Sequence, residues 1–173
     1  MLLKVMGAVL VILGSTGVGF YYSSMLSERT NELNNLKKII IMLRGEINYN
    51  HSTISESLSV IAKRTKPPFD IFLQETADKL REMPGETIGS IWKEMIKIHL
   101  QGTSLKDKDI ERLALLGDDL GYLDKKMQLS TLDLYSEHLE QQIQDSLTDY
   151  NKNSRLYRCL GIMGGILITL VIV

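Results

Sequence analysis

Charge is confined to the middle of this chain, and that segregation limits the available folds more than any other feature. The 173 residues include 20 Lys and Arg and 21 Asp and Glu, and all of them except Lys4 lie between Glu28 and Arg158. The stretch from Val5 to Ser27 and the stretch from Cys159 to Val173 carry no charge. As helices they would be about 35 Å and about 22 Å long, against a hydrocarbon core of about 30 Å. The sequence therefore predicts an N-terminal transmembrane anchor over residues 1–27 and a C-terminal transmembrane segment over residues 159–173.

The second segment is marginal by length, so snorkelling of Arg158 or local thinning of the bilayer would have to help it cross. The first segment has a rival interpretation as a cleaved signal peptide. Its apolar run is longer than the usual 7–15 residues and only Lys4 precedes it, which favours an uncleaved anchor.

Small residues at a spacing of four occur in both uncharged segments. They are Ser15 and Gly19 in the first, and Gly161 and Gly165 in the second. This spacing lets two membrane helices approach closely and predicts that the two segments pack together. The alternative is that glycine is simply common in membrane helices.

Basic residues flank the middle region on its own side of the two segments, whereas the opposite side has only Lys4 and the amino terminus. Loops rich in Lys and Arg stay in the cytoplasm. The region 28–158 is therefore predicted to be a cytoplasmic domain.

The middle region shows helical periodicity throughout and no alternating strand pattern, which predicts an all-α antiparallel bundle of about six helices. A capping box, Thr53 to Glu56, starts a second helix, and Pro67 and Pro68 are expected to stop it. Glycine and proline are absent from Asp124 to Arg158, so the last helix should run directly into the C-terminal segment. The predicted apolar seam of the first helix comprises Leu33, Leu36, Ile40, Leu43 and Ile47; that of the last comprises Leu132, Tyr135, Leu139, Ile143, Leu147 and Tyr150.

Several kinds of chemistry have no support in the sequence. A net charge of −1 gives no basic field for nucleic acid. No Gly-Lys pair exists for a phosphate-binding loop, and His51, His99 and His138 lack the spacing of metal ligands. The single cysteine, Cys159, rules out an intrachain disulfide. We expect no catalytic, cofactor or metal site and assign the chain a binding role.

One short segment stands out as a candidate contact surface. Gly117 and Gly121 are expected to bracket the end of a helix with a positive φ, and Asp124 should begin the next helix. The charged side chains around this corner are expected to contact a partner, the alternative being an ordinary solvated face; they are Asp118, Asp119, Lys125 and Lys126.

The same segment carries a family resemblance. Residues 115–124, with Gln128, Tyr135 and Leu139 after them, resemble stage III sporulation protein AB of endospore-forming bacteria, and more distantly the inner-membrane platform proteins of type II secretion and type IV pilus machines. The first resemblance extends over almost the whole chain; it includes Met6-Gly7-Ala8, Leu43-Arg44-Gly45-Glu46-Ile47 and Leu156-Tyr157-Arg158-Cys159-Leu160-Gly161.

The resemblance implies a non-enzymatic platform in the mother-cell membrane that engulfs the forespore. It would dock a cytoplasmic secretion-type ATPase, similar to stage III sporulation protein AA, to other membrane subunits of a channel. Unlike secretion platforms, this chain has one cytoplasmic domain and two anchors, so a homo-oligomer would have to compensate. Two rival interpretations remain: a membrane-anchored sensory domain with a polar ligand pocket inside the bundle, and a secreted helical domain after signal cleavage near Ser23.

Overall fold

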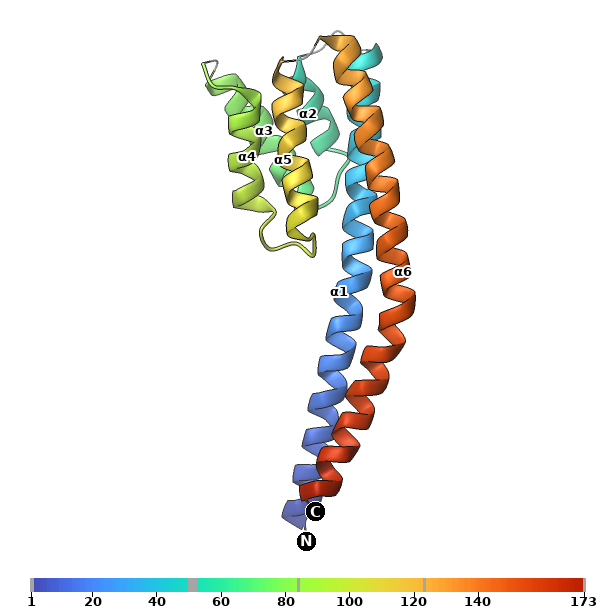
Figure 1. Cartoon of the computed structure of the whole chain (residues 1–173). Coiled ribbons are helices and arrows are strands. Elements are labelled where there is room, and N and C mark those ends of the chain that lie inside the picture. Colours follow the sequence, from blue (N-terminus) through green and yellow to red (C-terminus); the bar gives the residue numbers. More distant parts are fainter. Residues whose placement is uncertain (1, 50–52, 84, 123, 173) are drawn as a thin grey trace. The chain divides into compact units, whose positions relative to one another are not determined.

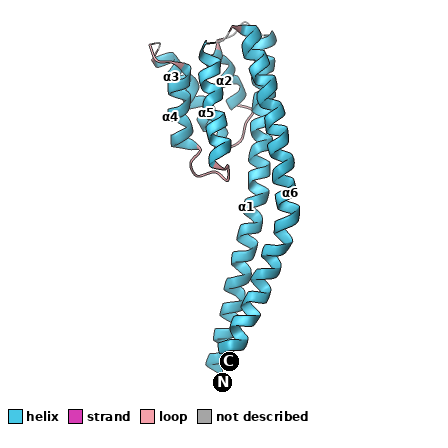
Figure 2. Cartoon of the chain, in the orientation of Figure 1, coloured by secondary structure: helices cyan, strands magenta, loops and turns pink. Residues whose placement is uncertain are grey.

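The computed structural model of the chain describes residues 2–49, 53–83, 85–122 and 124–172, and it describes only part of the side chains before residue 24 and after residue 152. Within these ranges every regular element is a helix, as expected for an all-α chain (Figures 1 and 2). The elements are α1 (Leu2–Tyr49), α2 (Ile54–Ala62), α3 (Phe69–Glu82), α4 (Ile88–His99), α5 (Asp107–Tyr122) and α6 (Lys125–Ile172).

The first and last helices are 48 residues long each. The predicted N-terminal anchor and the first helix of the middle region are thus parts of one uninterrupted helix, α1. The last helix continues through Arg158 without a break, as expected from the absence of glycine and proline. Among the residues whose surroundings are described, no helix is long and apolar enough to cross a membrane. The surroundings of nearly all of Cys159 to Val173, and of part of Val5 to Ser27, lie outside the described residues.

The chain forms two compact units. Unit 1 contains residues 1–31 and 143–173, from α1 and α6, and unit 2 contains Glu32–Gln142. In unit 1 the Thr30 and Ser146 hydroxyls share a buried hydrogen bond of 2.8 Å, which joins α1 to α6. Ser146 is buried and Leu147 is exposed, so the prediction that Leu147 faces inward is wrong. The polar pair with Thr30 occupies the inward position instead.

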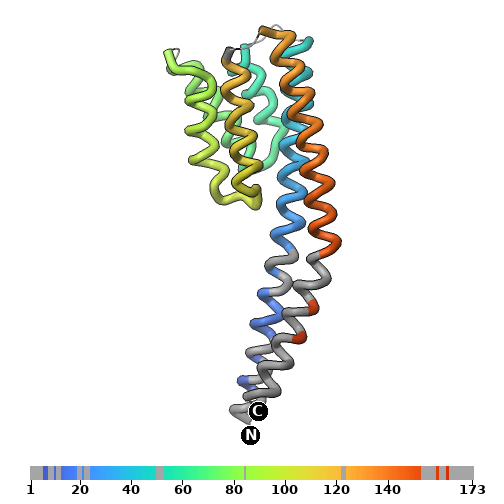
Figure 3. The backbone as a smooth tube through the Cα atoms, in the orientation of Figure 1, coloured from blue at the N-terminus to red at the C-terminus, as the bar shows by residue number. Residues whose placement is uncertain are grey.

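In unit 2 the predicted seam of α1 is confirmed, because all five of its apolar residues are buried. Two ion pairs connect this part of α1 to α6. Lys37 Nζ lies 2.9 Å from Glu140 Oε2, and Arg44 donates two hydrogen bonds to Asp133, which raise the pKa of its guanidinium. The pairs are seven residues apart on each helix and run in opposite directions, so α1 and α6 are antiparallel here (Figure 3).

The four short helices complete unit 2. The capping box at the start of α2 is confirmed: Glu56 N–H donates to Thr53 Oγ1, and Thr53 N–H donates to the Glu56 carboxylate. This second bond lowers the pKa of Glu56. Helix α2 ends at Ala62, before the two prolines, and just beyond this end Thr65 Oγ1 donates to the Ile61 carbonyl.

Trp92 of α4 joins three of these helices. Its ring lies edge to face against Phe72 of α3, with centroids 4.8 Å apart, and its Nε1–H donates to the Leu113 carbonyl of α5 at 2.8 Å. Both aromatic rings are fully buried. Burial of rings of this size contributes much of the stability of a small helical core.

Candidate functional site

The corner that the sequence singled out lies between the end of α5 and the start of α6. Asp124 caps α6, because its Oδ1 accepts from Met127 N–H at 2.8 Å and its carbonyl accepts from Gln128 N–H at 2.8 Å. Gln128 Nε2 also donates to the Leu120 carbonyl of α5 at 2.9 Å. The expectation that Asp124 begins the helix is confirmed, and the corner is held by hydrogen bonds on both sides.

The prediction for the two glycines is wrong. Helix α5 passes through Gly117 and Gly121 to Tyr122, and no described glycine has a positive φ. A Cβ atom on Gly117 would lie 2.4 Å from Trp92 Cδ1, and one on Gly89 of α4 would lie 2.2 Å from Asp118 Oδ1. At Gly121 the nearest neighbour of such an atom would be Ile88, at 3.5 Å. Gly117 and Gly89 therefore let α4 and α5 cross closely.

The charged residues of the corner divide into two groups. Asp118 forms an ion pair of 2.6 Å with Lys93 of α4, and Lys125 Nζ donates to the Asn48 carbonyl near the end of α1 at 2.9 Å. These two side chains connect helices within unit 2. Asp119 and Lys126 are exposed and have no side-chain partner among the described residues. They are the charges of the predicted surface that remain available to a partner.

A groove of about 240 Å³ lies between α5 and α6, on the face that contains Asp119. Two of its apolar side chains, Leu115 and Leu134, are 60% and 55% exposed. The sequence does not reveal the groove, because a single exposed leucine is ordinary in a helix. The signal that could have found it is the identical spacing on the two helices; the lining residues are Arg112, Leu115, Leu116, Asp119, Thr131, Leu134, Tyr135 and His138.

Asp109 of α5 lies one turn before Arg112, at the end of α5 that is remote from the corner. It is 2% exposed; its Oδ1 accepts from Gln142 Nε2 of α6 at 2.6 Å and its Oδ2 accepts from Lys106 N–H at 2.9 Å. Asp109 therefore supports the start of α5. Burial, and then the charge of Asp109, raises the pKa of the neighbouring Tyr135 hydroxyl.

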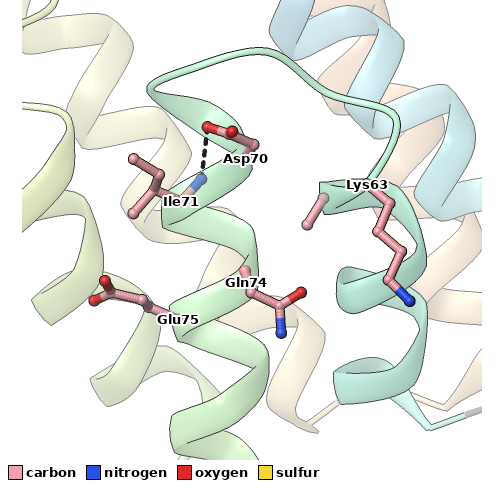
Figure 4. A pocket seen from close by; sticks show the side chains of 6 residues that line it. Lys63, Asp70, Ile71, Gln74 and Glu75 are labelled. Carbon is pink, nitrogen blue, oxygen red and sulfur yellow. Dashed lines mark hydrogen bonds between the residues drawn. The ribbon is translucent and has the colours of Figure 1, made fainter.

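A second hollow, of about 360 Å³, lies between α2 and α3. Its charged groups do not converge: Glu75 points to the other side of α3 from Lys63, and the Asp70 carboxylate accepts from Ile71 N–H (Figure 4). Glu75 pairs with His99 of α4 at 2.8 Å. The arrangement stabilises helix contacts and offers no convergent set of polar groups to a ligand.

The structure describes the surroundings of only some of the other residues named from the sequence. His138 is half-buried in the groove, and His51 lies outside the described residues. Ser15 is half-buried in α1, whereas the surroundings of Gly19, Gly161 and Gly165 lie outside the described part. In that part, no group of three or more His, Cys, Asp or Glu side chains is arranged to hold a metal ion.

Three comparisons with known proteins point to one family. The family model described as Stage III sporulation protein AB matches residues 4–173. Stage III sporulation protein AB of Bacillus subtilis (strain 168) is 27% identical over 171 residues, which cover 99% of each chain. A solved structure of stage III sporulation protein AB superposes with a TM-score of 0.66 at 25% identity and covers 71% of this chain and 96% of its own.

Proposed function

Because the chain belongs to the stage III sporulation protein AB family, we propose that it is a non-enzymatic membrane platform of the channel between mother cell and forespore. In this proposal, the helical domain docks a cytoplasmic secretion-type ATPase, similar to stage III sporulation protein AA, to membrane subunits of the channel. The observation that carries the proposal is the family match over residues 4–173, which includes both uncharged ends as well as the charged middle.

The charge segregation supports two membrane anchors, over residues 1–27 and 159–173. In unit 1 the hydrogen bond between Thr30 and Ser146 joins the two helices from which these segments continue. Two joined anchors would fix the orientation of the domain in the membrane. The basic residues that flank them favour the mother-cell cytoplasm for the domain 28–158.

The α5–α6 corner is the proposed contact for the ATPase. The hydrogen bonds of Asp124, Lys125 and Gln128 hold the corner in place, so little conformational entropy is lost when a partner binds. Lys126 is exposed in the first turn of α6. Helix α6 then continues without a break to Ile172. A shape change of the ATPase at the corner would thereby be transmitted along one helix into the C-terminal segment.

Binding of the purified ATPase to the full-length chain in lipid nanodiscs tests this proposal. We expect saturable binding with a Kd in the range of about 1–10 µM, typical of a transient contact. Lys126→Glu should weaken binding about tenfold, because it reverses a charge at the contact. Lys97→Glu is the matched control, since Lys97 is an exposed lysine on α4, and it should bind like the parent chain. Absence of binding at about 100 µM ATPase would refute the proposal.

A further inference from the structure

The groove between α5 and α6 is lined by two outward stripes with the same spacing. On α5 the stripe is Arg112, Leu115 and Asp119; on α6 it is Thr131, Leu134 and His138. Residues three and seven positions apart lie on one face of a helix. Each stripe therefore places a large apolar side chain between two polar ones.

The two stripes run in opposite directions, because α5 and α6 are antiparallel. Asp109 contacts Gln142 at one end, and the Leu120 carbonyl contacts Gln128 at the other. Arg112 and His138 consequently share the end near Asp109, and Asp119 shares the corner end with Thr131. The groove is basic at one end, apolar in the middle and acidic at the other end.

We propose that this face binds a second copy of the chain about a two-fold axis that passes through the middle of the groove. The axis lies in the interface and crosses the groove at right angles, so it reverses the direction of the groove in the partner copy. The basic end of each copy then meets the acidic end of the other. Arg112 of each copy then faces Asp119 of the other copy, so two such ion pairs form. Leu115 and Leu134, the exposed apolar residues, are covered at the centre.

The size of the face indicates a weak dimer. Helix α5 has 16 residues and is roughly 24 Å long, and with α6 beside it the face is about 20 Å wide. Two such faces would bury about 1,000 Å² in total, which is at the lower limit for specific association. Confinement of both copies to one membrane would raise their effective concentration and favour pairing.

Cysteine cross-linking of the full-length chain in membranes tests the pairing. A residue close to a two-fold axis lies near its own counterpart, so Leu115→Cys on a Cys159→Ser background should form a disulfide-linked dimer on mild oxidation. Ile98→Cys on the same background is the matched control, because Ile98 of α4 is 57% exposed, nearly as exposed as Leu115. We expect about ten times more cross-linked dimer from Leu115→Cys. Equal amounts from the two variants would overturn the proposal.

Charge reversal identifies the occupant of the groove. With Leu115→Cys present, Arg112→Asp or Asp119→Arg alone should lower the cross-linked fraction about tenfold, because each turns two attractions into two repulsions. Both residues are exposed, so the fold should survive either change. The double variant restores complementary ends in a two-fold pair and should recover the dimer. A double variant as weak as the single ones would mean that a different polypeptide fits the groove, and the proposal would be wrong.

Discussion

Trp92 leaves no room for a side chain at position 117. The indole ring fills the space where a side chain at position 117 would begin, and it is held there by Phe72 and by its hydrogen bond to the Leu113 carbonyl. A ring fixed from two sides has little room to move. The role of this glycine is to let α4 and α5 approach, and the sequence alone does not distinguish that role from a helix cap.

Gly117→Ala should therefore destabilise the protein by about 1–3 kcal/mol, since the added methyl group overpacks a fixed ring. Gly45→Ala is the matched control: Gly45 is also helical, but a Cβ atom there would have nothing within 4 Å. That change should stabilise the protein by up to about 1 kcal/mol through helix propensity. Thermal unfolding followed by circular dichroism would measure both, and equal Tm shifts would contradict the packing argument.

At the scale of elements, the sequence predicts a helix end well where nearby side chains cap the helix. Thr53 and Glu56 cap α2, and Asp124 caps α6, as expected from local sequence. The start of α5 is different, because Asp109, buried against Gln142, supports it in preference to the exposed Asp107. That choice depends on a contact with α6, which no local pattern reveals.

The same limit applies to the candidate site. The charges of the corner are visible in the sequence. The ion pair of Asp118 and the hydrogen bond of Lys125 depend on the positions of α4 and α1, which the sequence does not show. The groove was missed because Leu115 and Leu134 are 19 residues apart and meet only when α5 and α6 fold back on each other. Periodicity predicts which face of a helix is buried, but it does not predict which exposed faces lie side by side.

The cap of α2 gives the stability a specific dependence on pH. The folded state lowers the pKa of Glu56, so its contribution is complete above its ordinary pKa and is lost as the pH falls through the lowered value. The Tm difference between the parent chain and Glu56→Gln should therefore be positive at pH 7 and shrink towards pH 3. Glu86→Gln, at an exposed loop glutamate, is the matched control. A difference for Glu56→Gln that does not change with pH would contradict this assignment.

At the scale of the whole molecule, the proposed platform requires its helical domain to lie on the side of the ATPase. Gln101→Cys on a Cys159→Ser background tests this, because Gln101 is exposed in the connection between α4 and α5. A membrane-impermeant maleimide should leave this cysteine unlabelled in intact cells and label it after permeabilisation. Labelling in intact cells would place the domain outside, as in the secreted alternative.

The most direct test of the platform is to detect contact with the ATPase in sporulating cells. A photoreactive phenylalanine analogue in place of Lys126 lies at the exposed start of α6, and the same analogue in place of Lys97 on α4 is the control. We predict a cross-linked product between the chain and the ATPase from position 126 and little from position 97. Absence of this product from position 126, in cells that contain both proteins, would contradict a platform that docks the ATPase at the α5–α6 corner.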